Sequence, residues 1–474
     1  MTTKNIILSV DSYKTSHYKA YPEDTTMIAS YIEARKNNSP YNINEVVFLG
    51  TEMFMDSYLN PITKYDIDEA EDTITKHGLP FNREGWEHIL NEWGGMPPLA
   101  IRALPEGSLV PFGVPQVEVW NTDEKCFWLT SYIETALLRA IWYPSSVATI
   151  SNYCKRIIYH FLKQTSDDPA GQILFKLHDF GARGAASAEA AAIGGVAHLV
   201  NFRGTDTIEA LSLARETYSC GMAGFSIPAA EHSTVTAWGR EGEIAAYENM
   251  LDKFSSPGHM VAVVSDSYDL FNAIANIWGG TLKKKLIETG GTLVIRPDSG
   301  NPIEVLKKVF DILESKFDIT LNQKGFKLLP NYIRVIQGDG VNPDSIYNIL
   351  NVLTNMGWST DNIAFGMGGA LLQNVNRDTF GYAMKASVKQ GTETGAIGIS
   401  KNPITDAGKK SKEGYHFVNL DNKIYTSDME ETTLKETSNK DGLFNSLEYR
   451  FYFSESSRTT FDAIRRRADS WMTD

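Results

Sequence analysis

Seven short apolar segments recur along the middle of the chain, and each is followed by a polar or glycine-rich tail. They span 173–178, 196–202, 224–228, 260–264, 292–296, 332–337 and 362–365. Helix-like stretches separate them, so the spacing predicts successive strand–helix units. An eighth strand is expected near 145–150 or 383–388. We therefore expect an α/β fold with a (β/α) barrel, the alternative being an open doubly wound sheet; either places functional groups at the carboxyl ends of the strands.

The two ends of the chain differ from this middle part. Residues 1–140 are rich in aromatic side chains and less regular, and 385–474 are polar and strand-like. A chain of 474 residues also exceeds one ordinary core. We expect 141–384 to form the barrel-like domain that carries the chemistry, and 1–140 together with 385–474 to form a second, α+β domain.

Charge and cysteine content exclude several classes of protein. The formal net charge of −13 argues against non-specific binding to nucleic acid, which depends on neutralising phosphates. Cys126, Cys154 and Cys220 are an odd, unpatterned set, which fits a reducing compartment better than a disulfide framework or zinc site. The longest apolar runs are too short for a signal peptide or membrane span. We expect a cytoplasmic protein that binds neither nucleic acid nor membrane.

Basic residues and glycines gather in the strand tails. Arg183 and Arg296 each follow a predicted strand, and a guanidinium group matches the oxygens of a phosphate. The turn at 366–369 follows the last predicted strand and precedes a short helical segment, which is the arrangement of a phosphate cradle. Surface ion pairing is the alternative for the arginines. Neither a P-loop nor a strand-linked G-x-G-x-x-G motif occurs.

Acidic side chains occupy several of the same tails. Asp298 and Asp339 lie in glycine-rich turns and suit ribose hydroxyls or a magnesium shell, with turn capping as the alternative. Glu231, His232 and Asp266 end neighbouring apolar segments. A histidine with an acidic partner can act as a nucleophile or proton shuttle.

Longer stretches resemble one family, the nicotinamide phosphoribosyltransferases, which are type II phosphoribosyltransferases. The resemblance covers about residues 5 to 415 in order. It rests on DSYK at 11–14 with HYK at 17–19, KLHDFG at 176–181, NF and GTDT within 201–207, PAAEHST at 228–234, VSDSYD at 264–269, IRPDSGNP at 295–302 and VIQGDG at 335–340.

The resemblance implies a homodimer with two active sites at its interface. It implies that the nicotinamide ring is sandwiched between Phe180 of one subunit and Tyr13 of the partner subunit, and that Asp206 accepts a hydrogen bond from the carboxamide. Arg296 is expected near the base and ribose. The remaining contacts to ribose and phosphates are expected from Asp298, Gly338, Asp339, Gly368, Gly369, Arg377, Arg183, Arg35, Lys385, Lys401 and Lys409.

The implied reaction joins nicotinamide to 5-phosphoribosyl 1-pyrophosphate, forming nicotinamide mononucleotide and pyrophosphate in NAD salvage. The resemblance implies that ATP phosphorylates His232, which Asp266 orients and Glu231 adjoins. Mg²⁺ is expected near the pyrophosphate, with Asp11 and Asp266 as candidate ligands.

Three other functions remain open on the sequence. A nicotinate phosphoribosyltransferase shares the scaffold and differs in its substrate, and Asp206 is the residue that should discriminate. A phosphosugar isomerase or aldolase would place a catalytic Lys or a Glu/His pair at strand ends, where this chain has mainly Arg, Asp and Gly. A non-catalytic binding protein would not need His232, Asp298, Arg296 and Asp206 together.

Overall fold

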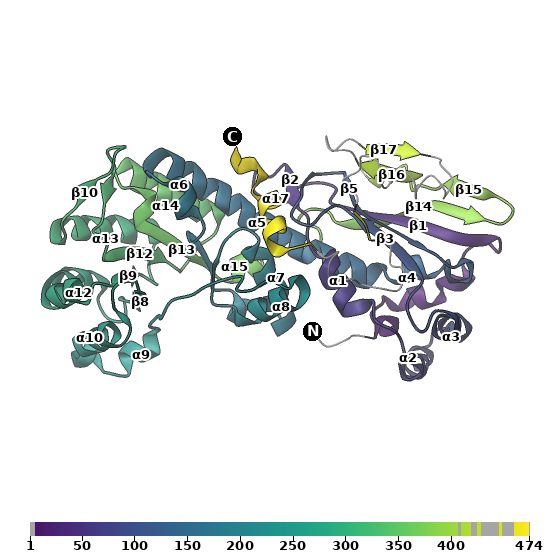
Figure 1. Ribbon diagram of the computed structural model, residues 1–474, viewed down its shortest axis with the longest axis horizontal. Helices are drawn as coiled ribbons and strands as arrows, with labels where there is room; N and C mark the ends of the chain where they lie inside the picture. Colours follow the sequence, from purple (N-terminus) through teal and green to yellow (C-terminus); the bar gives the residue numbers. More distant parts are fainter. Residues whose placement is uncertain (1–4, 406–408, 419–423, 428–444, 448–458, 474) are drawn as a thin grey trace. The chain divides into compact units, whose positions relative to one another are not determined.

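The computed structural model describes residues 5–405, 409–418, 424–427, 445–447 and 459–473 (Figure 1). The chain divides into two compact units. Unit 1 consists of Met1–Thr149, Ala214–Cys220 and Val375–Asp474. Unit 2 consists of Ile150–Leu213 and Gly221–Asn374.

Unit 1 is built on an antiparallel sheet of six strands. Their order is β15 (Gly395–Gly398), β14 (Ala383–Gly391), β1 (Thr25–Glu33), β5 (Pro115–Asn121), β3 (Leu99–Ala103) and β18 (Asn445–Leu447). Two small antiparallel pairs accompany it: β2 (Glu45–Val47) with β4 (Leu109–Pro111), and β16 (Tyr415–Val418) with β17 (Ile424–Ser427). The first and last thirds of the chain therefore share one sheet.

Helices complete unit 1. They are α1 (Thr51–Tyr58), α2 (Lys64–Lys76), α3 (Arg83–Glu92), α4 (Leu129–Tyr132) and α17 (Phe461–Ala468). The long helix α5 (Glu134–Thr165) continues from unit 1 into unit 2. Several begin at a polar cap: Thr63 and Asp66 form a capping box at α2.

Unit 2 contains a parallel sheet of six strands. Their order is β7 (Gly204–Thr205), β6 (Leu177–Asp179), β13 (Ile363–Met367), β12 (Ile333–Gln337), β9 (Thr292–Arg296) and β8 (Met260–Val264). The segment 225–230 bonds to both edge strands, through Thr205 N to Phe225 O at one edge and Ala230 N to Ala262 O at the other. This segment partly closes the sheet, but it makes only isolated bridges.

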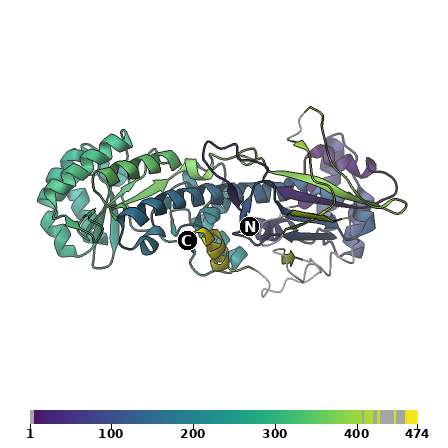
Figure 2. The same ribbon diagram turned by 90° about the horizontal axis from the view of Figure 1, so that it is seen from above.

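The helices of unit 2 lie around its strands (Figures 1 and 2). They are α6 (Pro169–Ile173), α7 (Ala188–Leu199), α8 (Ile208–Tyr218, whose end belongs to unit 1), α9 (His232–Thr236), α10 (Glu243–Phe254), α11 (Leu270–Asn272), a π-helix (Ala273–Thr281), α12 (Lys283–Thr289), α13 (Pro302–Lys316), α14 (Pro343–Asn355) and α15 (Gly369–Leu372), with the strand pair β10 (Thr320–Leu321) and β11 (Lys327–Leu328). Asn301 and Asn342 cap α13 and α14, and a proline follows each. These caps fix where the chain turns from a strand end into a helix.

Two of the seven predicted segments, 196–202 and 224–228, are not strands, since 224–228 makes only isolated bridges, and the expected eighth strand is not part of the parallel sheet. Residues 196–199 end helix α7, because the alanine-rich stretch before them continues as a helix; only Gly204–Thr205 pairs as a strand. Residues 145–150 lie in α5, and 383–388 lie in β14 of the other sheet. Among the described residues, the parallel sheet therefore has six strands rather than the expected eight.

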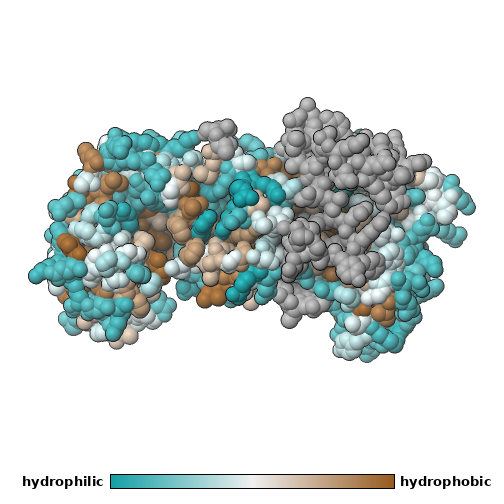
Figure 3. Space-filling view, viewed as in Figure 1, coloured by the Kyte–Doolittle hydropathy of each residue, from teal (hydrophilic) through white to brown (hydrophobic). Residues whose placement is uncertain are grey.

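The described surface shown in Figure 3 is largely hydrophilic, with scattered apolar patches. Within the described ranges, every helix is too short or too polar to cross a bilayer.

Candidate active site

The carboxyl ends of the parallel strands in unit 2 carry most of the predicted site residues. Phe180 follows β6, Asp206 follows β7, Asp266 follows β8, and Arg296 ends β9 with Asp298 just beyond it. Because parallel strands end at the same edge of a sheet, residues far apart in the sequence meet there. Gly338 and Asp339 follow β12, and Gly368 and Gly369 follow β13. The other predicted residues of unit 2 lie beyond β6 (Arg183) and at the start of α9 (Glu231 and His232).

His232 and Asp266 form a hydrogen-bonded pair at this edge. His232 is the first residue of α9, and its Nε2 lies 3.0 Å from Oδ1 of Asp266. The other carboxylate oxygen accepts bonds from the backbone N–H of Asp298 at 3.0 Å and from the hydroxyl of Ser299 at 2.5 Å. The Asp266 side chain is only 4% exposed, whereas that of His232 is 46% exposed. A buried, fixed carboxylate therefore orients an accessible imidazole.

The ionisation of Asp266 follows from these contacts. Burial raises the pKa of Asp266, but the hydrogen bonds from Ser299, His232 and the Asp298 backbone more than offset it, so its pKa lies below the ordinary value. Glu231 does not bond to His232; its carboxylate accepts the hydroxyl of Ser233. The imidazole is thus paired with a carboxylate that remains ionised at neutral pH.

Arg296 and Asp298 continue this cluster. Nη2 of Arg296 donates to Oδ2 of Asp298 at 3.1 Å, and the same oxygen lies 3.9 Å from Nδ1 of His232. Nε of Arg296 is buried and has no hydrogen-bond partner in the described part of the chain. A buried unpaired guanidinium N–H is costly, so this atom is suited to a ligand that supplies an acceptor.

Phe180 lies against glycines from two neighbouring strand ends. A Cβ added to Gly366 would lie 1.9 Å from the Phe180 ring, and one added to Gly338 would lie 3.3 Å from it. The backbone N–H of Phe180 donates to the carbonyl of Met367 at 3.0 Å. Glycine in β13 therefore makes room for the aromatic ring, and the backbone holds it there.

Asp206 is bonded through one oxygen only. Oδ1 accepts the hydroxyl of Ser226 at 2.6 Å and lies 3.0 Å from Nε2 of His178. Among the described residues, Oδ2 has no partner. Burial raises the pKa of Asp206, but the bonds from His178 and Ser226, together with the charge of Arg296, lower it below its ordinary value. The residue is an ionised acceptor with a free oxygen.

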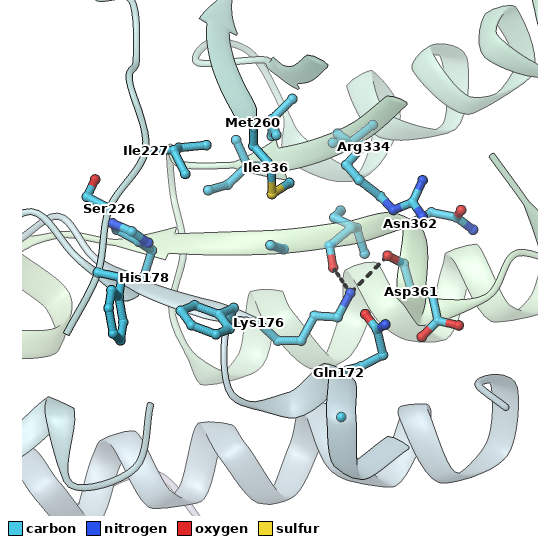
Figure 4. Close-up of a pocket in the computed structure, with 17 residues that line it drawn as sticks. Gln172, Lys176, His178, Ser226, Ile227, Met260, Arg334, Ile336, Asp361 and Asn362 are labelled. Atoms are coloured by element: carbon cyan, nitrogen blue, oxygen red, sulfur yellow. Dashed lines mark hydrogen bonds between the residues drawn. The ribbon is translucent and has the colours of Figure 1, made fainter. Parts of the chain in front are cut away.

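A pocket in unit 2 begins beside His178 and Ser226, the two residues that bond to Asp206. Its volume is about 420 Å³, and its lining includes His178 and Ser226 at one end. Figure 4 shows Arg334 and Asp361 toward the other end, with Ile227, Met260 and Ile336 between. The pocket is mainly apolar with polar groups at its ends, as ligand pockets commonly are.

Glycines dominate the two remaining strand ends. Gly338 and Asp339 follow β12, where the Gln337 amide donates to the carbonyl of Asp339 at 2.8 Å. Gly368 and Gly369 follow β13, and a Cβ on Gly184 would lie 3.2 Å from the Cα of Gly369. The turn that carries the exposed Arg183 therefore packs closely against the start of α15.

Unit 1 gathers the other predicted cations in one pocket. Its volume is about 520 Å³, and its lining includes Arg35, Lys36, Arg377, Lys385, Lys401 and Lys409. Burial lowers the pKa of Lys385, and the charges of Arg35 and Lys401 add to this effect. So many cations around one pocket indicate a polyanionic ligand. Lys36 was not predicted, although its place beside Arg35 was a signal.

Tyr13 and Asp11 also belong to unit 1. The Tyr13 side chain is 58% exposed, so its ring is available for stacking. Asp11 accepts the Thr135 hydroxyl through Oδ2 at 2.7 Å. Roles for His178, Ser226 and Ser299 were not predicted from the sequence. For His178, strand alternation was a usable signal, because it faces away from the buried Leu177 and Asp179.

The strand ends do not form a ready-made metal cage. In the described ranges, the cluster of three close ligand atoms is His88, Asp123 and Cys126, all in unit 1. Mg²⁺ usually binds through one or two carboxylates together with substrate phosphates. The carboxylates at the strand ends fit a metal that arrives with its substrate.

Comparisons with known proteins identify the family of the chain. The profile of the nicotinate phosphoribosyltransferase (NAPRTase) family matches residues 175–443, and that of the nicotinamide phosphoribosyltransferase N-terminal domain matches residues 5–101. The chain is 51% identical over 411 residues, 86% of each chain, to a nicotinamide phosphoribosyltransferase of Xanthomonas campestris pv. campestris. It is 31% identical over 446 residues, 86% of this chain and 87% of the relative, to that of Acinetobacter baylyi.

The fold has a solved counterpart. The crystal structure of nicotinate-nucleotide pyrophosphorylase from Pyrococcus furiosus covers 98% of this chain, and this chain covers 95% of it, with a TM-score of 0.59 at 14% identity. This likeness concerns the fold alone. The sequence identities and matched profiles together establish that the chain belongs to the nicotinamide phosphoribosyltransferase family.

Proposed function

We propose that this chain transfers the phosphoribosyl group of 5-phosphoribosyl 1-pyrophosphate to nicotinamide, forming nicotinamide mononucleotide and pyrophosphate for NAD salvage. The observation that carries the choice of base is Asp206, an ionised carboxylate with Oδ2 free, near the end of a pocket that also contains His178. Phe180 supplies an aromatic face close to it, with its ring 5.2 Å from that of His178 between centroids.

Asp206 favours an amide over an acid for electrostatic reasons. An ionised carboxylate accepts a hydrogen bond from the NH₂ of nicotinamide, but it has no proton to donate to nicotinate. Two like charges in a partly buried pocket also repel each other. Helix capping is the alternative role, but Oδ1 bonds to His178 and Ser226, and in the described part of the chain the side chain bonds to no backbone N–H of α8.

The reaction requires positioning and charge neutralisation. The pyridine nitrogen attacks the anomeric carbon with its own lone pair; the new C–N bond forms as the C–O bond breaks, and pyrophosphate leaves with that electron pair. No general base is needed. Phe180 and Asp206 hold the ring, Arg296 meets base and ribose, and Asp298, Gly338 and Asp339 bind the ribose hydroxyls.

The phosphates require cations from both units. In this proposal the 5′-phosphate is bound by Gly368 and Gly369 of one subunit and by Arg377 of the partner subunit. Arg183 binds pyrophosphate. The pocket of unit 1 contributes Arg35, Lys385, Lys401 and Lys409 from the partner subunit, and Tyr13 of the partner subunit stacks on the base. Two such sites form per cytoplasmic homodimer. The clustering of these cations in one pocket supports the assignment.

Mg²⁺ would neutralise charge on the departing pyrophosphate. Asp298 and Asp339 offer carboxylates beside the ribose. Asp11 and Asp266 remain candidate ligands, although Asp266 already accepts three hydrogen bonds.

His232 is proposed to accept a phosphoryl group from ATP. A neutral imidazole that donates from Nε2 to Asp266 keeps its lone pair on Nδ1, which faces Asp298 at 3.9 Å. The N–P bond would form at Nδ1 as the terminal P–O bond of ATP breaks and ADP leaves. Asp266 would hold the ring and balance its positive charge.

The test replaces Asp206 by serine and measures kcat/KM for nicotinamide and nicotinate. Asp206→Ser should weaken use of nicotinamide and admit nicotinate. The Asp206 side chain is 49% exposed, so solvent screens part of the charge clash with nicotinate, and the selectivity should fall by at most about 10³-fold. Asp344→Ser, which removes an exposed aspartate from the first turn of α14, is the matched control.

The result that would refute this role is an unchanged selectivity with reduced stability. Asp206 would then be a structural residue, and nicotinate phosphoribosyltransferase would return as the alternative. Turnover with nicotinamide and 5-phosphoribosyl 1-pyrophosphate in the unmodified protein tests the reaction itself.

A further inference from the structure

His178 is the inward-facing residue of β6, and the reaction described above gives it no task. Its Nε2 lies 3.0 Å from Oδ1 of Asp206, and its side chain is 14% exposed. Ser226 donates to the same oxygen at 2.6 Å. Asp206 therefore has two donors on one oxygen, and its other oxygen has no partner among the described residues.

The orientation of the His178 ring is set by its neighbours. β6 and β7 pair so that His178 lies opposite Gly204, and a Cβ on Gly204 would come within 2.5 Å of Nδ1. The ring of Phe180 packs nearby, at an interplanar angle of 55°. The imidazole thus lies against bare backbone, and any larger residue at position 204 would displace it.

The charge of this pair depends on the imidazole. Because Asp206 is ionised, Nε2 of His178 must carry the proton of the hydrogen bond, and Nδ1 is free to gain a second one. With a neutral ring the pair carries one negative charge; with a protonated ring it carries none. Nicotinamide is neutral and nicotinate is an anion, so the charge of the pair affects the binding of nicotinate more than the binding of nicotinamide.

We propose that His178 is a positioning residue that holds Asp206 ready for the carboxamide, and that protonation of His178 relaxes the rejection of nicotinate. This inference rests on the proposed role of Asp206 as the residue that selects the amide. The site would accordingly discriminate best at alkaline pH and least well at acidic pH.

Other charged groups surround the pair. Arg296 at the end of β9 acts on Asp206. Asp179 in β6 is buried and accepts bonds from Thr205, Thr207 and the Gly181 backbone. Burial lowers the pKa of His198 in α7 to about 4, so this residue stays neutral at working pH.

Two cations line the same pocket farther away. Burial lowers the pKa of Lys176 to about 7, and Arg334 lies with it toward the opposite end (Figure 4). Because Lys176 can change its charge near neutral pH, the experiment must separate its effect from that of His178. A variant of His178 that leaves Lys176 in place does so.

The measurement is the ratio of kcat/KM for nicotinamide to kcat/KM for nicotinate, from roughly pH 6 to pH 8.5. Both bases use the same phosphoribosyl donor, so titration of its phosphates cancels in the ratio. In the unmodified enzyme the ratio should fall about tenfold toward the acid end, the size of effect expected for one charge beside a half-buried carboxylate.

His178→Gln is the decisive variant. Glutamine can donate to Asp206 from nearly the same place but cannot gain a charge, so the ratio should stay high at alkaline pH and should no longer fall with acid. Ser226→Ala is the matched control: it removes the other donor to Oδ1 without removing the titrating group, so nicotinamide use should weaken while the pH slope persists. Gly204→Ala pushes the ring aside and should flatten the slope without changing His178.

Equal slopes in the unmodified enzyme, His178→Gln and Gly204→Ala would overturn the proposal and point to Lys176. Asp206→Ser is measured alongside. If it leaves the ratio unchanged at pH 8.5, the role of Asp206 fails; if it changes the ratio while His178→Gln leaves the slope intact, only the role of His178 fails.

Discussion

One ring nitrogen of His232 is hydrogen-bonded, and within the described part of the chain the other is not. Nε2 is held by the buried carboxylate of Asp266, and Nδ1 has Asp298 at 3.9 Å. An exposed imidazole held in this way is suited to accept and release a phosphoryl group. Among the described residues, His232 makes no hydrogen bond to Asp206, the residue proposed to bind the base. Its loss should therefore affect ATP use more than synthesis.

The corresponding prediction concerns His232→Ala. ATP hydrolysis should be abolished, whereas slow synthesis of nicotinamide mononucleotide should persist because base and phosphate contacts remain. Phosphate release from ATP and nucleotide formation are measured separately. His259→Ala, an exposed histidine of the same unit, should change neither. Full ATPase activity in His232→Ala would rule out the phosphohistidine.

Single residues also show what the sequence could and could not predict. Asp266, Asp298 and Phe180 could be placed at strand ends because each follows an apolar run. The contact of Ser226 with Asp206 could not, since 225–230 joins the two sheet edges only through isolated bridges and the pairing is non-local. Hydrogen bonds between distant loops depend on register, which periodicity does not encode.

At the scale of elements, strands rich in β-branched residues were predictable. β8, β9, β12 and β13 coincide with apolar runs bounded by polar tails. β7 is only two residues long, and the apolar run before it belongs to a helix, so composition alone pointed to the wrong element. The strand at 383–391 was recognisable as a strand, but its partner β1 lies at the other end of the chain.

Lys176 ties two elements of the parallel sheet together and should make stability depend on pH. Its ammonium group donates to the carbonyls of Thr360, Asp361 and Ile363 at 2.9–3.2 Å. Burial lowers its pKa to about 7, with Arg334 adding to the decrease and Asp361 opposing it. An unfolded lysine titrates near 10.4, so between about pH 7 and pH 10.4 the unfolded chain binds more protons than the folded one.

Stability should therefore rise with pH across that window; it is lost as pH falls from about 10.4 to about 7, and this group causes no further change below about pH 7. The denaturation midpoint in urea measures this slope. Lys176→Met should flatten it, whatever its effect on absolute stability, whereas Lys284→Met, whose side chain is 87% exposed, should retain it. An identical slope in Lys176→Met would show that other groups account for the pH dependence.

At the scale of the whole molecule, the proposed site draws on two subunits. Tyr13 and Arg377 belong to unit 1, and Phe180 and Asp206 belong to unit 2. If each site combines unit 2 of one chain with unit 1 of its partner, two different inactive chains can complement each other. One site in each mixed dimer would then contain both defects and the other neither.

Mixing Tyr13→Ala with Asp206→Ala should restore nicotinamide turnover. Each dimer that contains one chain of each kind has one intact site of two, so it should reach up to about half of the activity of an unmodified dimer. Subunit exchange is followed with differently tagged chains. Mixing two preparations of Tyr13→Ala is the control and should restore nothing. Exchanged dimers that stay inactive would contradict the shared site.

The pairing of β1 with β14 has a consequence for how the protein is made. β1 ends at Glu33 and β14 begins at Ala383, so the ribosome must add 350 residues before the interior strand of unit 1 receives its neighbour. At bacterial or eukaryotic translation rates of about 5–20 residues per second, that wait lasts roughly 18–70 s. During it, the largely apolar β1 has one unpaired edge, the kind of surface that aggregates. The strand synthesised almost at the start therefore keeps one unpaired edge until most of the chain has been made.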